Sequence, residues 1–313
     1  MKHFIQLSDT EDLDQLIQDA LSLKQKPITQ LPGKGKTLGM LFFNASLRTR
    51  LSTEKAARLL GMEVMSMNVM NDGWALEFSD GVIMNSDKAE HVKEAAGVLS
   101  QYCDILAVRS FPGLIDKDAD QKEQVLEAFR RYASIPIVNL ESATAHPLQA
   151  LADAMTILEL KNTKKPKVVL TWAPHPKALP QSVPNSFVQI MQEIDVELVI
   201  TNPPGYNLNP QVVQQTPVVH DQKAAMEGAD FVYVKNWSSF EQYGQILIKD
   251  QNWMMDQEKW RLTHEAKVMH CLPVRRNVVI SEELLDGPHA VVLQQAANRT
   301  FAAQAVIKNL LGG

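Results

Sequence analysis

The alternation of strand-like and helix-like segments is the feature that most limits what this chain can fold into. Short apolar runs, the first at 37–43, alternate with amphipathic stretches along the whole sequence. Strands joined by helices of this length form parallel sheets with helices on both faces. We therefore expect an α/β fold with doubly wound parallel sheets. With 313 residues, the chain is long enough for one or two domains.

The expected strands and helices follow one another through two halves of the chain. Strands are expected at 37–43, 63–69, 104–108, 136–139, 167–171, 196–201, 231–234 and 267–270. Between the fourth and fifth strands, Pro147–Leu160 has a strong helical pattern, and we interpret it as the bridge between the halves. A closing helix is expected from about residue 296. The polar stretch 71–87 is expected to be a long loop, and loops of that length often carry function.

Composition excludes several classes of protein. A net charge of −5 argues against a nucleic-acid partner, and two cysteines exclude a disulfide framework. The first residues contain no apolar signal segment, and no run of about 18 apolar residues occurs, so no membrane partner is expected. We predict a cytoplasmic protein.

The end of the first strand carries the first chemical signal. The run Ser46-Leu47-Arg48-Thr49-Arg50 places hydroxyls and arginines where a helix begins. The first turn of a helix has backbone N–H groups without intrahelical partners and a partial positive charge, and arginine matches the geometry of a phosphate. This run favours an anion site. A capped helix with solvated arginines explains it equally well when the run is taken alone.

The other strand ends favour the anion site, because ligands in such sheets bind beyond the carboxyl ends of the strands. Cations, neutral hydrogen-bonding groups and one carboxylate recur there, and two domains whose strand ends face a common cleft would bring them together. The residues concerned are Arg109, Glu141, His146, His175, Lys235, Cys271 and Arg275.

Three short segments that contain some of these residues resemble motifs of one family. Ser46–Arg50, His146-Pro147-Leu148-Gln149 and His270-Cys271-Leu272-Pro273 resemble the S-x-R-T-R, H-P-x-Q and H-C-L-P motifs of the transcarbamylase family, in the same order and with similar spacing. The resemblance implies a carbamoyl-phosphate-binding domain at 1–147, with the helix 296–313 packing back on it, and an amine-binding domain at 148–295. It also implies a homotrimer with active sites shared between subunits.

The resemblance also implies roles for individual residues. Transcarbamylation is the attack of a neutral amine on carbamoyl phosphate, and it needs no metal or organic cofactor. The implied carbamoyl-phosphate ligands are Ser46, Leu47, Arg48, Thr49, Trp74 (from a neighbouring subunit), Arg109, His146, Gln149 and Arg275. Of these, Arg109 and His146 reach the carbonyl oxygen and Gln149 holds the carbamoyl NH2. Cys271 lines the point where the amine meets the leaving group.

Lys235 indicates which amine is used. Ornithine enzymes of the family place an aspartate at this position, where it pairs with the free α-ammonium group, and Lys235 would instead repel it. The chain resembles the N-acylornithine branch of the family. The substrates of this branch have an acylated α-amine, and the second domain of its enzymes contains a backbone knot. The implied acylornithine ligands are Glu141, His175, Lys235, Cys271, Leu272, Arg275, Arg299 and Ala89.

Ala89 bears on the choice between the two acylornithines. Acetyl-type enzymes place a glutamate at this position and succinyl-type enzymes typically a proline, so neither family residue is present. Alanine removes a negative charge that would repel a succinyl carboxylate. We therefore predict N-succinylornithine as the acceptor, with N-acetylornithine as the alternative and ornithine less favoured.

Two other functions fit the sequence less well. A non-catalytic sensor of anionic metabolites predicts the loss of at least one phosphate or carbonyl ligand, and none is lost. An NAD-dependent dehydrogenase is disfavoured because no G-x-G-x-x-G follows any expected strand.

Overall fold

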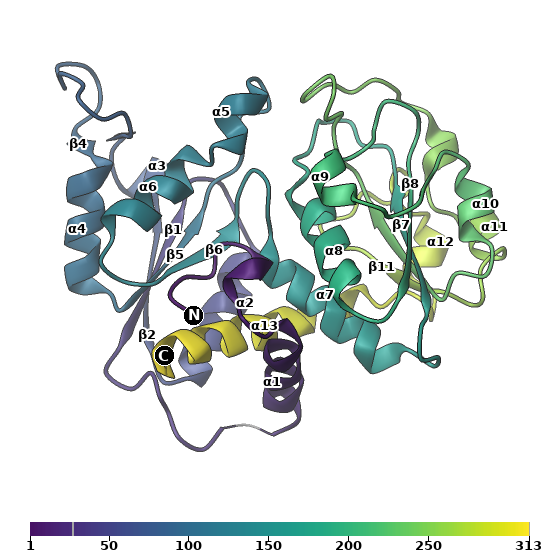
Figure 1. The fold of residues 1–313 in the computed structure, drawn as a ribbon, viewed down its shortest axis with the longest axis horizontal. Coiled ribbons are helices and arrows are strands. Elements are labelled where there is room, and N and C mark those ends of the chain that lie inside the picture. The colour runs from purple at the N-terminus through teal and green to yellow at the C-terminus, as the bar shows by residue number, and fades with distance from the viewer. Residues whose placement is uncertain (27, 313) are drawn as a thin grey trace. The chain divides into compact units, whose positions relative to one another are not determined.

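A computed structural model describes residues 1–26 and 28–312 (Figure 1). The chain forms two compact units. Unit 1 comprises Met1–Gly113, Lys117–Leu148 and the segment from Arg299 onward, and unit 2 comprises Leu114–Asp116 and Gln149–Asn298. Each unit contains its own parallel sheet, as the alternating pattern predicted. In the described part of the chain, no helix is long and apolar enough to cross a membrane.

The sheet of unit 1 has four parallel strands in the order β2-β1-β5-β6. These strands are β1 (Thr37–Phe42), β2 (Glu63–Asn68), β5 (Ile105–Arg109) and β6 (Ile137–Glu141). The chain runs from β1 outward to β2 and then returns to place β5 on the other side of β1. The neighbouring strands β1 and β5 therefore flank the point where the winding reverses, which is where ligands bind in open α/β sheets.

Helices cover both faces of this sheet. One face carries α4 (Val92–Tyr102) and α6 (Gln124–Tyr132), which pack against each other and on apolar residues of β1 and β5. The helix that links β1 to β2 is α2 (Arg48–Leu59), and α1 (Leu13–Gln25) lies near the N-terminus. Because β1, β5 and β6 are buried on both faces, they read in sequence as continuous apolar runs.

The sheet of unit 2 has five parallel strands in the order β11-β10-β7-β8-β9. They are β7 (Lys167–Trp172), β8 (Glu197–Thr201), β9 (Val218–Val219), β10 (Phe231–Lys235) and β11 (Lys267–Met269). Here the winding reverses between β7 and β10. The carboxyl ends of these two strands lead directly into the segments that hold His175 and Lys235.

Side chains of β10 alternate between the two faces of this sheet. Val232 and Val234 belong to a core cluster that includes residues of α10 (Gln222–Met226) and α12 (Glu282–Leu285). Tyr233 points to the opposite face, where its ring lies 4.2 Å from that of Phe187 on α8 (Ser182–Glu193). This alternation follows from the period of two in a strand and buries both faces of the sheet.

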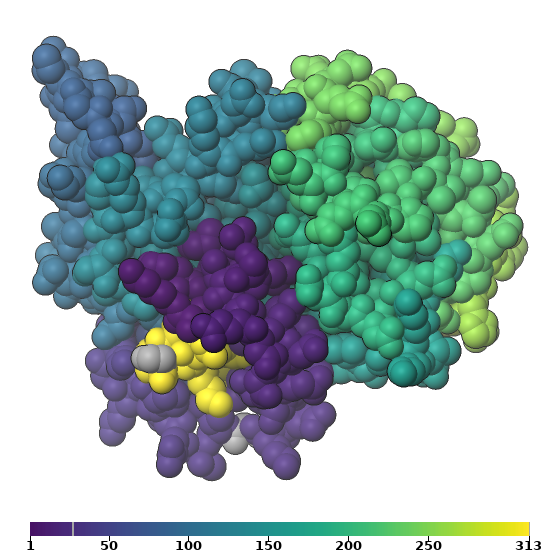
Figure 2. Space-filling view, in the orientation of Figure 1, coloured from purple at the N-terminus to yellow at the C-terminus, as the bar shows by residue number. Residues whose placement is uncertain are grey.

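The last helix, α13 (Val292–Gly312), starts earlier than the sequence predicted. Its residues from Arg299 onward belong to unit 1, where Ala305 and Lys308 share a surface hollow with Met1 and Asp19 of the N-terminal segment. Figure 2 shows the last turns of α13, in yellow, beside the purple N-terminal segment on the surface of this unit. Gly313, the end of the predicted helix 296–313, lies outside the described residues.

The segment 71–87 is not a simple loop. It begins within the short helix α3 (Val69–Asp72) and contains β3 (Leu76–Glu77), which pairs in parallel with β4 (Glu90–His91). Elements of two to four residues show no sequence periodicity, so the pattern could not predict them. The side chain of Glu77 accepts an N–H from Phe78 and from Ser79, and this turn fixes the chain just after β3.

Candidate functional site

The start of α2 in unit 1 presents an anion-binding geometry. The buried strand β1 delivers the chain to Ser46, and Leu47, which has no side-chain oxygen, occupies the N-cap position. Thr49 is buried in the first turn, whereas Arg48 is only partly covered. A helix of 12 residues carries a partial positive charge at this end. The turn therefore combines backbone donors, hydroxyls and a guanidinium in the arrangement that suits a phosphate group.

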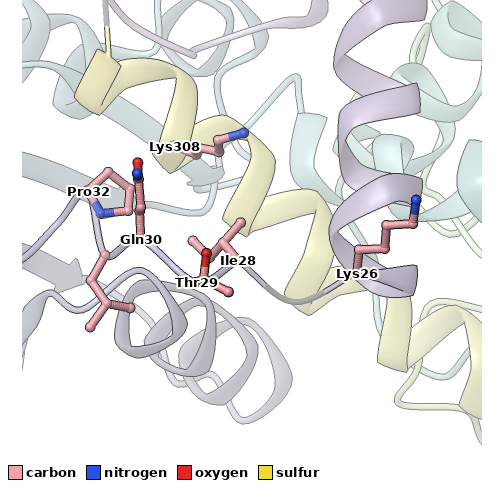
Figure 3. Close-up of a pocket in the computed structure, with 7 residues that line it drawn as sticks. Lys26, Ile28, Thr29, Gln30, Pro32 and Lys308 are labelled. Atoms are coloured by element: carbon pink, nitrogen blue, oxygen red, sulfur yellow. The ribbon is translucent and has the colours of Figure 1, made fainter.

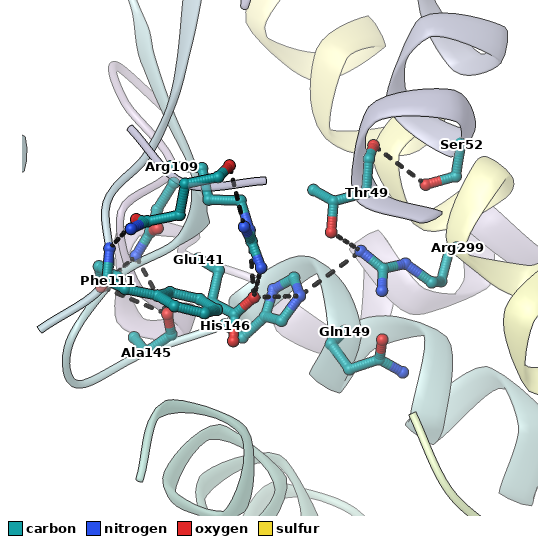
Figure 4. A network of polar contacts seen from close by, with 12 residues as sticks. Thr49, Ser52, Arg109, Phe111, Glu141, Ala145, His146, Gln149 and Arg299 are labelled. Atoms are coloured by element: carbon teal, nitrogen blue, oxygen red, sulfur yellow. Dashed lines mark hydrogen bonds and ion pairs between the residues drawn. The ribbon is translucent and has the colours of Figure 1, made fainter. Parts of the chain in front are cut away.

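Arg299 connects the closing helix to this turn. Its Nη2 atom donates to Thr49 Oγ1 at 2.6 Å and lies 3.4 Å from His146 Nε2 (Figure 4). All three side chains are buried. Three predicted site residues that are widely separated in sequence are thus gathered within unit 1.

Arg109 is held in place by a buried ion pair. Its Nη2 and Nε atoms donate to Glu141 Oε2 at 3.0 and 3.3 Å, and Nη1 donates to the carbonyl oxygen of Ala45 at 2.6 Å. The guanidinium also stacks on the Phe111 ring, 4.1 Å from its centroid. Figure 4 shows these contacts joined to His146, whose Nε2 atom lies 3.7 Å from Glu141 Oε2. The end of β5 is therefore tied to the turn before α2.

Glu141 lies at the carboxyl end of β6 in unit 1 and contacts Arg109. Family resemblance assigns it to the acylornithine, and that role stays a prediction. In the structure its carboxylate orients Arg109. Removing either partner would leave the other charge buried without its counter-ion, which is costly.

Trp74 and Ala89 lie outside the network of Figure 4. Trp74 is exposed, and its indole Nε1 donates to Glu90 Oε2 at 2.9 Å. Ala89, also exposed, immediately precedes Glu90. The two predicted residues are thus joined through Glu90 on one surface of unit 1.

Unit 2 contains a hollow beyond β7, and two of the predicted acceptor residues, His175 and Arg275, line it. The hollow is lined by Pro174, His175, Pro176, Lys249, Gln251, Val274, Arg275, Arg276 and Val278. Arg275 Nε donates to His175 Nε2 at 3.0 Å. Arginine can only donate, so His175 accepts this bond at Nε2. Its Nδ1 atom lies 2.8 Å from the carbonyl oxygen of Lys177 and 3.1 Å from the backbone nitrogen of the same residue. His175 is therefore a neutral imidazole in this arrangement.

The surroundings of His175 carry excess positive charge. Burial lowers its pKa below the ordinary value, and the charges of Lys235, Arg275 and Lys177 lower it further, while the hydrogen bond to the Lys177 backbone opposes these effects. Lys235 itself is buried at the end of β10. Buried or clustered cations require anionic partners. The positive charge around His175 is thus suited to a ligand with carboxylate groups.

Replacing Lys235 with alanine is expected to raise the pKa of His175, because the variant removes a positive charge that disfavours the imidazolium form. An NMR titration of the histidine ring protons, assigned with His175→Gln, measures the shift. Lys165→Ala is the matched control, since Lys165 is exposed and precedes the opposite end of β7. An unchanged or lower pKa in Lys235→Ala would contradict this electrostatic description.

Cys271 and Leu272 follow β11 in a turn held by hydrogen bonds. The N–H of Leu272 donates to His270 Nδ1 at 2.8 Å, and the N–H of His270 donates to Gln295 Oε1 at 2.9 Å. Leu272 has a φ of 56°, in the left-handed region that bulky residues rarely adopt. Such conformations cluster at functional sites and persist where the surrounding structure fixes them.

Sequence reasoning missed several residues that contact the predicted ones. Glu123 accepts hydrogen bonds from Ser142, Ala143 and Thr144, and so fixes the segment that leads into His146. Asp153 accepts a hydrogen bond from Gln149. Asp153 lies four residues after Gln149 on α7 (Pro147–Leu160), and side chains at this spacing on a helix are neighbours. The spacing could therefore have predicted this contact. Glu123 and the segment that it fixes are about 20 residues apart, and no periodic pattern links them.

Two other features carry no assigned role. A second hollow of unit 1, lined by Lys26, Ile28, Thr29, Gln30, Leu31, Pro32 and Lys308, contains none of the predicted site residues (Figure 3). Within residues 1–26 and 28–312, no group of three or more His, Cys, Asp or Glu side chains could hold a metal ion.

Comparison with protein families gives two matches. The family described as aspartate/ornithine carbamoyltransferase, carbamoyl-P binding domain, matches residues 2–159. The Asp/Orn binding domain of the same description matches residues 180–310.

Individual relatives cover nearly the full chain. An N-succinylornithine carbamoyltransferase of Bacteroides thetaiotaomicron is 47% identical over 316 residues, which cover 100% of this chain and 99% of the relative. An N-acetylornithine carbamoyltransferase of Xanthomonas campestris is 34% identical over 336 residues, which cover 100% and 98%.

Solved structures agree in fold. A glutamate-to-alanine mutant of N-acetyl-L-ornithine transcarbamylase, complexed with carbamyl phosphate and N-succinyl-L-norvaline, superposes with a TM-score of 0.94. It is 34% identical, and the match covers 99% of this chain and 100% of that one. Acetylornithine transcarbamylase complexed with acetylcitrulline gives a TM-score of 0.93 at 33% identity, with 100% of both chains covered.

Proposed function

The chain belongs to the aspartate/ornithine carbamoyltransferase family, and on this premise we propose that it transfers the carbamoyl group of carbamoyl phosphate to the δ-amine of N-succinyl-L-ornithine. The products are N-succinyl-L-citrulline and phosphate, a step of arginine biosynthesis. The observation that carries the proposal is the grouping of a buried Lys235, Arg275 and a neutral His175 in unit 2, together with the grouping of Thr49, His146 and Arg299 in unit 1.

The donor is bound by unit 1 in this proposal. Phosphate oxygens accept from Arg48, from the hydroxyls of Ser46 and Thr49, and from the first N–H groups of α2. Arg299, which donates to Thr49, adds positive charge at the same place. Carbamoyl phosphate thereby gains a fixed orientation before the amine arrives, which is a large part of catalysis between two bound substrates.

The reaction requires stabilisation of developing charge. The amine nitrogen attacks the carbonyl carbon, the carbon–oxygen bond to phosphate breaks, phosphate leaves with the bonding electron pair, and the amine loses a proton. Negative charge develops on the carbonyl oxygen, where Arg109 and His146 act as donors. The ion pair with Glu141 holds the Arg109 guanidinium in one orientation, so little reorganisation is needed.

Lys235 and Arg275 of unit 2 bind carboxylate groups of the acceptor in this proposal. N-succinylornithine carries two carboxylates and no α-ammonium group, so its charge is complementary to Lys235 and Arg275. Free ornithine has an α-ammonium group that Lys235 would repel. A neutral His175 adds a hydrogen-bonding group without adding a further charge.

Two observations support the succinyl acceptor over the acetyl acceptor. The N-succinylornithine carbamoyltransferase relative is 47% identical, against 34% for the N-acetylornithine enzyme. Ala89 also supplies no negative charge, and a solved acetylornithine enzyme holds N-succinyl-L-norvaline when a glutamate is replaced by alanine. N-acetylornithine remains the second candidate.

A homotrimer with shared active sites is part of the proposal. Unit 1 exposes several large apolar side chains, including Leu47, Leu51, Met65, Met70 and Trp74, each more than half exposed. Exposed apolar groups of this kind mark protein–protein contacts. Trp74 and Ala89, joined through Glu90, would then reach the active site of a neighbouring subunit together.

We also propose the backbone knot of the N-acylornithine branch in unit 2. The proline-rich segment from Pro174 is bonded to the segment that follows β10. The N–H and hydroxyl of Ser238 donate to the Leu179 carbonyl oxygen, and Gln181 Nε2 donates to the Ser238 carbonyl oxygen at 2.9 Å. These bonds support close passage of the two segments.

A cytoplasmic location likewise stays a prediction.

The reaction is tested by measuring phosphate release and ureido product together. The purified chain should release phosphate from carbamoyl phosphate only when an acylornithine is present, with one ureido product for each phosphate. Binding of carbamoyl phosphate without turnover for any acceptor would refute the enzyme and favour the metabolite sensor.

A further inference from the structure

Asp153 is a buried carboxylate that the proposed chemistry does not use. It lies on α7 with no exposed surface, and its Oδ1 atom accepts from Gln149 Nε2 at 2.7 Å and from Gln295 Nε2 at 2.7 Å. A charged group costs several kcal/mol to bury unless hydrogen bonds compensate it. Two amide donors on one oxygen provide part of this compensation, and they also constrain the amides that donate.

Asp153 determines which end of the Gln149 amide faces it. A carboxylate can only accept hydrogen bonds, so Asp153 selects the rotamer of Gln149 in which Nε2 faces the carboxylate. An amide group is planar, and its oxygen and nitrogen lie on different sides of the terminal carbon. The oxygen Oε1 is therefore directed away from Asp153. Figure 4 shows the Gln149 amide at the first turn of α7.

This orientation of the Gln149 amide matches the hydrogen-bonding groups of carbamoyl phosphate. The carbamoyl NH2 group carries two hydrogen-bond donors, so the residue that holds it must present an acceptor. A flipped Gln149 would place its own NH2 against that of the substrate and lose the hydrogen bond. We propose that Asp153 is a positioning residue that fixes Gln149 with its carbonyl oxygen toward the carbamoyl group. This inference rests on the proposed function.

The same carboxylate also reaches the turn after β11. Gln295 donates to Asp153 and accepts the N–H of His270, the residue before Cys271. Tyr233 lies close by: burial raises its pKa well above the ordinary value, and the neighbouring Asp153 and Cys271 raise it further. Tyr233 therefore remains a neutral phenol. Asp153 thus connects Gln149 with the turn that carries Cys271 and Leu272.

The test compares three variants by steady-state kinetics with carbamoyl phosphate and N-succinylornithine. Asp153→Asn is nearly isosteric but can face Gln149 with either end of its amide. We expect kcat to fall about 10- to 100-fold, with a much smaller change in KM for the acylornithine. Gln149→Glu should be at least as impaired, because two carboxylates then face each other.

The double variant Gln149→Glu with Asp153→Asn tests directly whether residue 153 orients the side chain at position 149. The asparagine introduced at position 153 can donate through Nδ2 to the new glutamate at position 149. Gln295, which donates to the same oxygen of Asp153, then loses that acceptor, so the double variant is compared with Gln149→Glu and not with the unmodified protein. The carboxylate of that glutamate then presents an acceptor to the carbamoyl NH2. We expect kcat of the double variant to exceed that of Gln149→Glu by about tenfold or more. This comparison also serves if Asp153→Asn is too unstable to assay.

Glu159→Gln is the matched control. Glu159 lies on the same helix and accepts hydrogen bonds from Gln294 and Asn298, so it makes the same kind of link between α7 and α13 without contacting Gln149. The kcat of this variant should equal that of the unmodified protein. Asp153→Asn activity within about threefold of normal, or a double variant no better than Gln149→Glu, would overturn the inference. Inactivity of the unmodified protein would instead refute the proposed function.

Discussion

Replacement of Arg48 by alanine is expected to lower kcat/KM for carbamoyl phosphate by about 10²–10³-fold while the protein still folds. Arg48 is the first residue of α2 and is only partly buried, so its loss leaves no large cavity. The remaining hydroxyls and N–H groups would bind phosphate without the guanidinium fork that matches its geometry. Steady-state kinetics and a thermal melt of the variant measure both parts of this expectation.

Arg58→Ala controls for the loss of one positive charge on the same helix. Arg58 lies at the other end of α2, is exposed and pairs with Glu54 at 3.0 Å. Surface pairs of this kind contribute about 0–1 kcal/mol to stability, so activity should be unchanged. Near-normal activity of Arg48→Ala, or an equal loss in both variants, would contradict the assignment of this turn to the phosphate.

Replacement of Ala89 by glutamate is expected to change the acceptor preference. The new carboxylate would repel the distal carboxylate of N-succinylornithine, and kcat/KM for this acceptor should fall about 10- to 100-fold. The value for N-acetylornithine, which lacks that carboxylate, should change little or rise. Parallel kinetics with the two acceptors measure the change as a ratio, which is insensitive to the active fraction of each preparation.

Ala89→Gln separates charge from size. Glutamine has nearly the same volume as glutamate without its charge, so it should reduce use of N-succinylornithine less than glutamate does. If both variants lose activity equally, steric exclusion and not repulsion governs this position. If Ala89→Glu leaves the ratio of the two acceptors unchanged, Ala89 has no part in acceptor choice.

The strand and helix pattern predicted both parallel sheets, because buried parallel strands are continuous apolar runs that differ from amphipathic helices. It also placed Lys235 correctly at the carboxyl end of β10, and Arg48 where the helix after β1 begins. The pattern failed for 71–87, where β3 has only two residues and pairs with β4, which lies just after this segment and is equally short. Elements this short are set by turn hydrogen bonds and pairing, which leave no periodic signal.

The partners of the site residues could not be read from the sequence. Arg109 and Glu141 are 32 residues apart, and Arg275 and His175 are 100 apart. Each pair forms because the sheet brings the ends of separate strands together. A single sequence contains no pattern that predicts which of several charged residues will be in contact. The roles of the site residues toward each substrate remain predictions, whereas their grouping within each unit is structural.

The most direct test of the proposed function is a single assay of ureido-product formation from carbamoyl phosphate with three acceptors in parallel. N-succinylornithine should give the highest kcat/KM, N-acetylornithine a lower value, and ornithine little or none, because Lys235 stands where ornithine enzymes carry an aspartate. Preference for ornithine would contradict the role of Lys235. Preference for N-acetylornithine would contradict the role of Ala89 and leave only the carbamoyl transfer itself in place.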